Sequence, residues 1–374
     1  MTEKKRPFRP DWTVHPGEHL EELLTVYEIT QAELAERTGL SRKTINAIIR
    51  GEMLISAETA ILLESVLPWS ARTWMNLDVQ YRERCAQIEQ EHRIRASEQL
   101  IKTFPLLELK KRGIVPKTND IIEVGLALLA FFAIGDFGVW ERLWQPSALQ
   151  VAYRQQRYET KTPHIVSVWL REGQRAVEER PAPHAFNAST LRDTVSRLRA
   201  LSLQPADESW DLVREHCAEA GVTVVRVPHY PKLGVYAASY RYRGHTVIQL
   251  SGHQKSVDQV WFSLFHEIGH VLLHGVKDIF LDETDDKPPA PVTAGELAQQ
   301  EVEADAFARR QLIPDGAFRR FVSESRSGYS TERVEGFAAQ QGIHPSIVVG
   351  RLQHEQHLPY ATALSALKRI YDWD

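Results

Sequence analysis

The sequence predicts a mostly α-helical protein that carries one small α+β domain towards its C-terminus. Three observations lead to this fold class. Amphipathic helical runs with Gly and Pro stops fill residues 1–205, β-branched strand-like runs lie between residues 222 and 251, and a long apolar helix follows them. A chain of 374 residues exceeds one ordinary core. We therefore expect an N-terminal helix-turn-helix bundle at 1–82, a helical connecting region at 83–205, and a C-terminal domain at 206–374 with a small sheet and a helical C-terminal part.

The composition is that of a globular protein, with 43% apolar residues, 25% charged residues and a net charge of −4. Any contact with nucleic acid must therefore come from a local basic patch. The two cysteines, Cys85 and Cys217, are too few and too far apart for a disulfide framework or a zinc ribbon. No apolar segment follows the basic N-terminal residues, and the apolar run Gly125–Gly135 is shorter than a membrane helix. We expect a buried helix there, and a cytoplasmic protein without membrane contact.

The N-terminal elements are marked by caps. Thr30 followed by Glu33 has the spacing of a capping box, Gly39 ends that helix, and Ser41 is a suitable N-cap for the next helix, which stops at Gly51. A third helix is predicted from Ser56 to about Leu67, and a long charged helix follows it. Two short helices joined by a Gly turn predict a helix-turn-helix.

In a helix-turn-helix, the N-terminal residues of the second helix enter the major groove of DNA. Arg and Asn side chains can read guanine and adenine edges, and Arg and Lys also meet phosphates. The candidate DNA-binding residues are Arg37, Ser41, Arg42, Lys43, Thr44, Asn46 and Arg50. The basic residues Lys4, Lys5, Arg6 and Arg9 would add to the affinity. The alternative is a helical hairpin whose basic residues only form a solvated face.

The pattern changes after residue 206. Strands are predicted at Val222–Val227 and in the runs 234–242 and 245–251, and a long helix is predicted from Val257 to about His274. A Pro-rich acidic loop follows at 282–295, and a further helix runs from Glu296 to the residue before Pro314. The helix–Gly–helix pattern at 337–352 is rich in Ile and Val, so we assign it to the domain core and not to DNA.

The long helix contains H-E-x-x-H at His266, Glu267 and His270. Residues four apart lie on one helix face, so both imidazoles can approach one ion. Glu267, beside His266, is the candidate general base. Two buried His and a Glu would be costly to satisfy without a metal, although the motif also occurs by chance in helices that bind none. Zinc takes about four ligands, one of them water in a catalytic site, so a third protein ligand is required.

The third ligand must come from outside the motif. His274 continues the spacing, but three ligands at i, i+4 and i+8 of one straight helix span roughly 12 Å. We therefore expect His274 behind the ligands or facing the substrate. Glu301 and Asp305 share one face of the next helix, which suits Glu301 as the ligand and Asp305 as the carboxylate that orients a ligand His. Glu303 lies on another side of that helix and is the weaker candidate.

The segments "FHEIGHVLLHG" and "EVEADAFARRQLIP" resemble the ImmA/IrrE family of zinc metallopeptidases, and the resemblance covers about residues 206–360. It implies a zincin-like fold, Zn²⁺ held by His266, His270 and Glu301, and Glu267 as base. It also implies cleavage of a repressor or another regulatory protein. The family more often has Asn where this chain has Asp305.

The segments "HPGEHLEELL", "TQAELAERTGLSRKTINAIIRGE" and "WMNLD" resemble HigA-type antitoxins of the XRE-like repressor class. This resemblance implies a homodimer that binds double-stranded operator DNA. The expected function is thus a DNA-binding autorepressor and antitoxin with a zinc metallopeptidase domain that cleaves a regulatory protein. Two alternatives remain. One is a non-catalytic metal-binding sensor or antitoxin whose C-terminal domain binds a ligand or a cognate toxin. The other is a metallopeptidase whose N-terminal module binds protein.

Overall fold

The computed structural model describes residue 10 and residues 12–144, 163–252, 256–275, 294–325 and 328–371. They fall into two compact units. The first lies within residues 1–101 and 118–126, and the second within residues 102–117 and 127–374. The predicted Pro-rich acidic loop, except for its last two residues, and the basic residues Lys4, Lys5, Arg6 and Arg9 lie outside the described residues.

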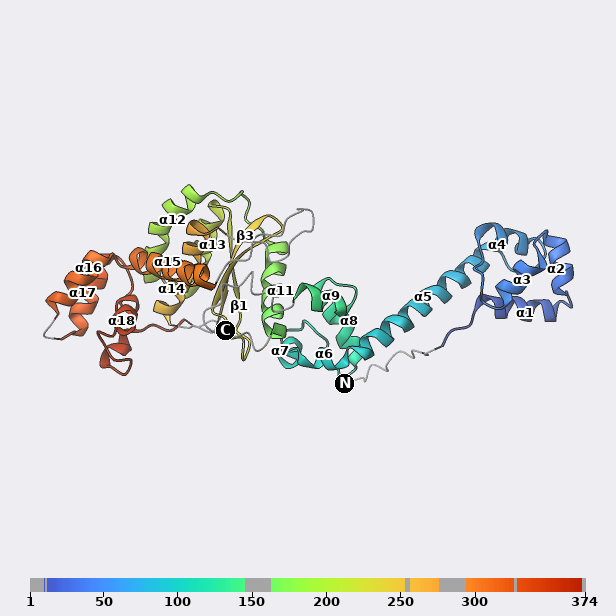
Figure 1. Ribbon diagram of the computed structural model, residues 1–374, viewed down its shortest axis with the longest axis horizontal. Helices are drawn as coiled ribbons and strands as arrows, with labels where there is room; N and C mark the ends of the chain where they lie inside the picture. Colours follow the sequence, from blue (N-terminus) through green and yellow to red (C-terminus); the bar gives the residue numbers. More distant parts are fainter. Residues whose placement is uncertain are drawn as a thin grey trace. The chain divides into compact units, whose positions relative to one another are not determined.

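The N-terminal unit is a bundle of short helices followed by one long helix (Figure 1). Its helices are α1 (Pro16–Val26), α2 (Gln31–Thr38), α3 (Arg42–Ile49), α4 (Ala57–Glu64) and α5 (Ala71–Ala96). The unit has a core of its own, in which Leu20, Leu34, Ile45, Ile48 and Trp74 are fully buried. The order α2, Gly turn, α3 is the predicted helix-turn-helix.

The predicted caps of α2 and α3 are confirmed. The Thr30 hydroxyl accepts a hydrogen bond from the Glu33 backbone N–H, and the Ser41 hydroxyl accepts one from the Thr44 N–H. Gly39 ends α2 in the left-handed conformation, with φ of 76°. Gly17 of α1 lies against α3, because a Cβ there would come within 2.1 Å of the Ile48 carbonyl oxygen. Only glycine allows this approach.

Two helices end earlier than the apolar pattern predicts. The third helix, α4, ends at Glu64 and not near Leu67, although Leu67 is buried. Leu67 precedes Pro68, and a residue before proline is disfavoured in the α-helical conformation. The predicted buried helix at 125–135 is α8 (Ile121–Phe132), which ends where Ala133 takes a positive φ of 55°. Most apolar side chains of α8 are buried, as predicted.

In the part of the chain that the structure describes, no single helix has the length and apolar character needed to cross a membrane. Only α8 and α9 (Phe137–Leu143) taken together meet that criterion, and they are bent by 41°.

The C-terminal unit contains a three-stranded sheet among helices. Helices α6 (Glu98–Thr103) and α7 (Leu106–Lys111) precede α8 along the chain. After α9 come α11 (Pro163–Glu179), α12 (Ala188–Ala200), α13 (Ala206–Glu219), β1 (Val222–Val227), β2 (Ala237–Tyr242), β3 (His245–Ser251), α14 (Val257–Leu273), α15 (Ala294–Leu312), α16 (Asp315–Glu324), α17 (Thr331–Gln341) and α18 (Pro345–His354). Short 3₁₀ turns lie at Leu201–Leu203 and Ala363–Leu367.

The strands are ordered β1-β3-β2, with β1 parallel and β2 antiparallel to β3. Helix α11 covers one face of the sheet, and α13 and α14 lie on the other side (Figure 1). Because both faces are covered, β1 and β3 are buried almost continuously and do not alternate between buried and exposed positions.

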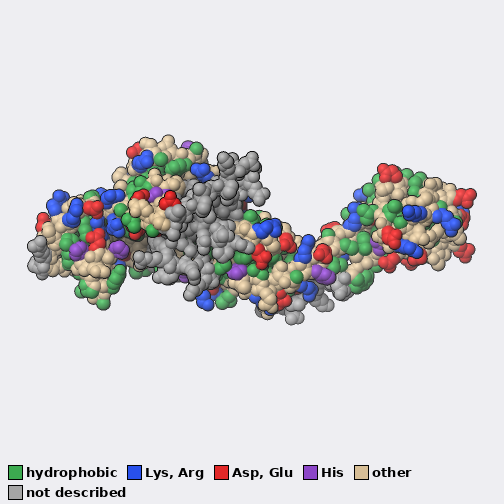
Figure 2. Space-filling model, viewed as in Figure 1, with side chains coloured by type: hydrophobic (Ala, Val, Ile, Leu, Met, Phe, Trp, Pro, Cys, Tyr) green, Lys and Arg blue, Asp and Glu red, His purple; other side chains and the backbone are tan. Residues whose placement is uncertain are grey.

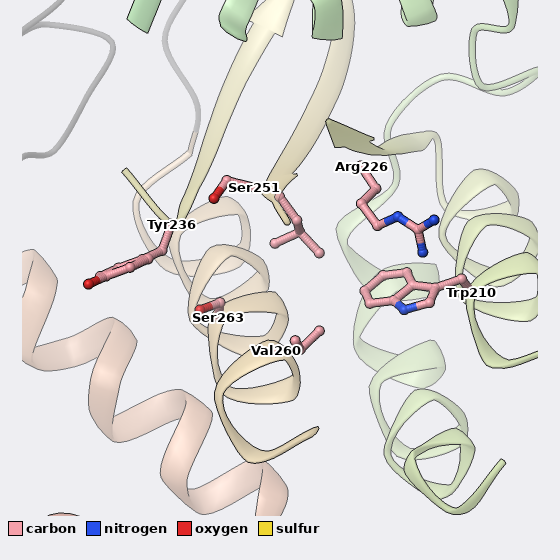
Figure 3. A pocket seen from close by; sticks show the side chains of 7 residues that line it. Trp210, Arg226, Tyr236, Ser251, Val260 and Ser263 are labelled. Atoms are coloured by element: carbon pink, nitrogen blue, oxygen red, sulfur yellow. The ribbon is translucent and has the colours of Figure 1, made fainter. Parts of the chain in front are cut away.

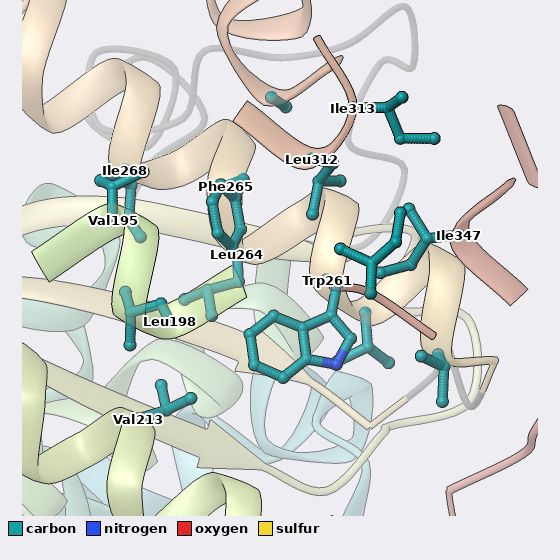
Figure 4. Packing of buried hydrophobic residues seen from close by; sticks show 14 of the residues in the cluster. Val195, Leu198, Val213, Trp261, Leu264, Phe265, Ile268, Leu312, Ile313 and Ile347 are labelled. Carbon is teal, nitrogen blue, oxygen red and sulfur yellow. The ribbon is translucent and has the colours of Figure 1, made fainter. Parts of the chain in front are cut away.

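The main core lies between the sheet, α13 and α14. Trp261, Leu264 and Phe265 of α14 pack there with Leu312 of α15 and Ile347 of α18 (Figure 4). The helix–Gly–helix segment predicted at 337–352 forms α17 and α18, joined at Gly342 with φ of 64°. Most of α18 is buried in this core, as expected for a segment that does not read DNA. This packing holds α14 and α15 side by side.

Candidate metal centre

Helix α14 carries the H-E-x-x-H segment, and it packs closely against α15. A Cβ at Gly269 would lie 3.3 Å from the Ala304 Cα and 3.1 Å from the Phe307 ring. Ala304 itself is fully buried. Small residues on both helices therefore allow the close approach that places carboxylates of α15 beside the histidines of α14.

His266, His270 and Glu301 form a compact group that could hold a metal ion, because one ligand atom from each lies within 4.8 Å of the others. The Nε2 atoms of the two histidines are 2.9 Å apart, and the Glu301 carboxylate lies 3.4 Å from His266 Nε2 and 3.3 Å from His270 Nε2. A tetrahedral ion with bonds of about 2.0–2.1 Å separates its ligand atoms by roughly 3.3 Å. The donor set and its spacing therefore fit a divalent cation such as zinc.

The charges of this group are strongly coupled. Burial by itself would lower the pKa of His266, but hydrogen bonds to Asp305 and Glu301 outweigh it and raise the pKa to about 10. Burial would raise the pKa of Glu301, but its hydrogen bonds to His266 and His270 lower it to about 2. The carboxylates that favour a proton on His266 could equally balance the charge of a cation in its place.

The outward-facing ring nitrogens of both histidines have partners. The Asp305 carboxylate lies 2.9 Å from His266 Nδ1, and His274 Nδ1 lies 3.1 Å from His270 Nδ1. The Glu303 carboxylate lies 2.9 Å from His274 Nε2. Such contacts keep a ligand ring in one orientation, with its other nitrogen free for a metal.

Glu301 and Glu303 are thus separated by the fold. The Glu301 carboxylate lies beside the rings of His266 and His270, whereas the Glu303 carboxylate contacts the ring of His274. The contact of Glu303 with His274 was not expected from the sequence. The sequence shows the Glu303 carboxylate two residues after Glu301, but its partner could not be predicted without knowing how α14 and α15 cross.

Glu267 is buried, with 7% of its surface exposed. In the part of the chain that the structure describes, its carboxylate has no hydrogen-bond or ion-pair partner. A buried carboxylate without a partner is costly, so its position favours a polar ligand such as water beside it. It neighbours His266 along the chain, and its charge contributes to the raised pKa of that histidine.

A small cleft lies beside α14 at the end of the sheet (Figure 3). Ser263 and Val260 of α14 form one side, Tyr236 and Ser251 lie at the ends of β2 and β3, and Trp210 belongs to α13. Within the described residues, β2 pairs only with β3, so its other edge has no strand partner among them. Ser263 lies one turn before Glu267 on the same side of α14.

The residues predicted to contact DNA do not all share one face of α3. Arg42, Asn46 and Arg50 recur every four residues and lie with Lys43 on the side opposite the buried Ile45 and Ile48.

Three of the residues predicted to contact DNA also make contacts within the N-terminal unit. The Thr44 hydroxyl is 2.8 Å from that of Ser41, and Thr44 lies off this face. Ser41 is exposed and caps α3. Arg37, on α2, forms an ion pair with Glu33. Arg42, Lys43 and Arg50 are exposed and Asn46 is partly exposed, and no hydrogen bond or ion pair holds their side chains among the described residues.

Each of the two units contains a segment that matches the model of a known protein family. Residues 217–352 match the model of the M78 peptidase family, described as the IrrE N-terminal-like domain. Residues 26–72 match the model described as Helix-turn-helix. The first match contains the sheet, α14, α15 and the possible metal ligands, and the second contains α2, α3 and α4. A search of curated proteins found no match.

Proposed function

Because the chain joins a helix-turn-helix domain of the XRE type to an IrrE-like domain of the M78 peptidase family, we propose that it is a DNA-binding transcriptional regulator with zinc-dependent endopeptidase activity. The observation that carries the proposal is the group of His266, His270 and Glu301 with the buried Glu267 beside it. Among the described residues the Glu267 carboxylate accepts no hydrogen bond, so it is available to a water molecule at the ion.

The chain's own groups suit peptide hydrolysis. His266, His270 and Glu301 would hold the ion, and Asp305 and His274 would keep the two imidazoles in position. When bound, zinc supplies a Lewis acid that polarises the scissile carbonyl and lowers the pKa of water. Glu267 would accept the proton of the attacking water and return it to the departing amine.

The substrate would bind as an extended peptide. The edge of β2 that has no strand partner among the described residues would offer backbone N–H and C=O groups, and β2 packs against α14. A peptide that adds to this edge gains main-chain hydrogen bonds whatever its side chains. We propose a repressor or another regulatory protein as the substrate, since the same chain carries a DNA-binding domain.

The peptidase proposal is tested with purified wild-type protein and Glu267→Gln, measuring zinc content and hydrolysis of a peptide pool. Glu267→Gln should keep zinc and lose about 10²–10⁴-fold in rate, because its task is proton transfer. Glu335→Gln, an exposed substitution on α17, is the matched control. A zinc-loaded wild-type protein that cleaves nothing would leave the domain as a metal-binding sensor.

The DNA proposal is tested by a gel shift with the DNA upstream of the protein's own coding sequence. We propose that the protein acts as a homodimeric autorepressor in the cytoplasm, with an antitoxin role towards a cognate toxin. Binding of two half-sites one helical turn apart would support the dimer. Growth arrest by a neighbouring small protein, relieved by co-expression of this chain, would support the antitoxin role.

A further inference from the structure

The C-terminal unit contains a cavity of about 180 Å³ that takes no part in the group of possible metal ligands. It opens to the surface and is lined by residues of four segments, namely α14, α15, α18 and the chain after α18. Phe262, Leu312, Ile313 and Ile347 give it apolar walls. Its charged lining residues are Asp258, Arg309, Arg351 and Lys368.

The cavity lies close to the possible metal ligands. Phe262 lies one turn before His266 on the same side of α14, and their rings are 6.2 Å apart between centroids. Arg309 lies one turn after Asp305 on α15, and Asp305 contacts His266. One helical turn is about 5.4 Å, so the cavity begins roughly one to two residues' length of extended chain from the histidines.

Among the residues that the structure describes, one cation of the lining has no hydrogen-bond or ion-pair partner. Lys368 pairs with Asp258 at 2.7 Å, and Arg351 pairs with Asp315 at 2.7 Å. The half-buried Arg309 guanidinium has no hydrogen-bond or ion-pair partner within the described ranges of the chain. Further Lys and Arg side chains lie on the surface of the helices α15 to α18 (Figure 2). An unpaired guanidinium beside apolar walls is suited to a carboxylate, which it can bind through two parallel hydrogen bonds.

The size of the cavity limits its occupant. A cavity of about 150 Å³ holds one benzene molecule, whereas pockets for drug-sized ligands are about 300–1,000 Å³. The cavity therefore has room for one side chain and not for a nucleotide or another large cofactor. The methylene groups of an acidic side chain would meet the apolar walls while its carboxylate meets Arg309.

We propose that this cavity is a specificity subsite that binds a carboxylate-bearing side chain, Glu or Asp, of the protein substrate through Arg309. The inference rests on the proposed peptidase function and adds to it a chemical requirement near the scissile bond. Phe262 and Leu312 would form the walls on either side of the bound methylene groups.

The test compares two peptide pools that are identical except that one carries Glu where the other carries Gln. The wild-type protein should cleave the Glu pool with a kcat/KM about tenfold or more above that of the Gln pool. In Arg309→Gln this ratio should fall to near one, and in Arg309→Lys it should be intermediate. Arg310→Gln is the matched control, since Arg310 is the exposed neighbour on α15. The ratio of the kcat/KM values for the two pools is unaffected by a general loss of folding or activity.

The outcomes separate this inference from the peptidase proposal. Cleavage with equal rates for both pools, or a Glu preference that survives Arg309→Gln, overturns the subsite and leaves the peptidase standing. If no pool is cleaved, the affinities of the two pools for the Glu267→Gln protein are measured. Tighter binding of the Glu pool supports the subsite if the difference disappears when Arg309 is also replaced by Gln. Thermal stabilisation by glutarate without any peptide preference would overturn it in favour of a site for free organic acids.

Discussion

At the scale of single residues, the two carboxylates Glu301 and Glu303 have different surroundings, although they lie two residues apart. Glu301 is beside the Nε2 atoms of two histidines, and Glu303 is beside His274. Glu301→Ala should therefore lose most bound zinc, because a direct ligand is removed. Asp305→Ala should lose about 10–100-fold in zinc affinity, the usual effect of removing a group that orients a ligand.

Glu303→Ala is the informative member of this series. It should retain zinc at a stoichiometry close to that of the wild type, since Glu303 contacts none of the three proposed ligands. Zinc content of the purified variants, measured by elemental analysis, decides the assignment. An empty site in Glu303→Ala together with a filled one in Glu301→Ala would show that α15 presents a different face to α14.

His344 makes the stability of the C-terminal unit depend on pH. Its Nδ1 caps α18 by accepting from the Ser346 N–H, which a protonated nitrogen cannot do. Burial and the nearby Arg369 charge lower the pKa of His344 to about 4. Between pH 6.5 and 4 the unfolded chain therefore binds more protons than the folded one, so stability falls as pH falls through this range. The loss should be about 1–3 kcal/mol after allowance for solvent screening.

His344→Asn provides the comparison, because Asn caps helices but does not titrate in this range. Chemical denaturation at pH 7 and pH 4.5 should show a smaller loss of stability for the variant than for the wild type. The other titrating groups are common to both proteins and cancel in the difference. Parallel pH profiles would mean that His344 is protonated in the folded state at a normal pKa.

At the scale of secondary-structure elements, α3 combines a buried apolar side with an exposed side that carries Arg42, Lys43, Asn46 and Arg50. Arg42→Ala should weaken specific operator binding by about 1–3 kcal/mol if it reads a base. Lys43→Ala should chiefly reduce the salt dependence, by about one unit of slope, if it meets a phosphate. Gel shifts at several salt concentrations measure both effects, and unchanged binding in both variants would remove α3 from the DNA.

The packing of α1 on α3 depends on Gly17, where a Cβ would lie 2.7 Å from the Ile49 Cα. Gly17→Ala must therefore push α3 away and should destabilise the N-terminal unit by roughly 1–3 kcal/mol. Gly336→Ala, in α17, meets nothing within 4 Å and should be neutral or stabilising. Calorimetry of the two variants gives the comparison. If the unfolding transition of the N-terminal unit is unaltered in Gly17→Ala, the close approach of α1 and α3 is contradicted.

At the scale of the whole molecule, the two units have separate cores, and all the proposed metal ligands lie in one of them. Removing zinc with a chelator should lower the thermal stability of the C-terminal unit, because an ion that binds only the folded state stabilises it. Operator binding by the chelated protein should be unchanged. A loss of DNA affinity on chelation, reversed by added zinc, would instead favour a metal-sensing regulator.

The sequence by itself determined the elements whose signals are local. The caps at Thr30 and Ser41, the turn at Gly39, the three strands and the long helix with His266 and His270 were all predicted, because a few neighbouring residues decide each of them. The family matches to both units followed from the same segments. The helix ends near Leu67 and Gly135 were misjudged, since apolar runs continue past the point where the backbone leaves the helix.

Only the tertiary structure decided which residues meet. The contact of Glu303 with His274 and the cavity around Arg309 join residues whose spacing along the chain says nothing of their distance. Each depends on how one helix crosses another, which small residues such as Gly269 and Gly17 permit and many weak contacts in the core determine together. A sequence pattern reports one helix at a time, whereas a site is made where two helices pack.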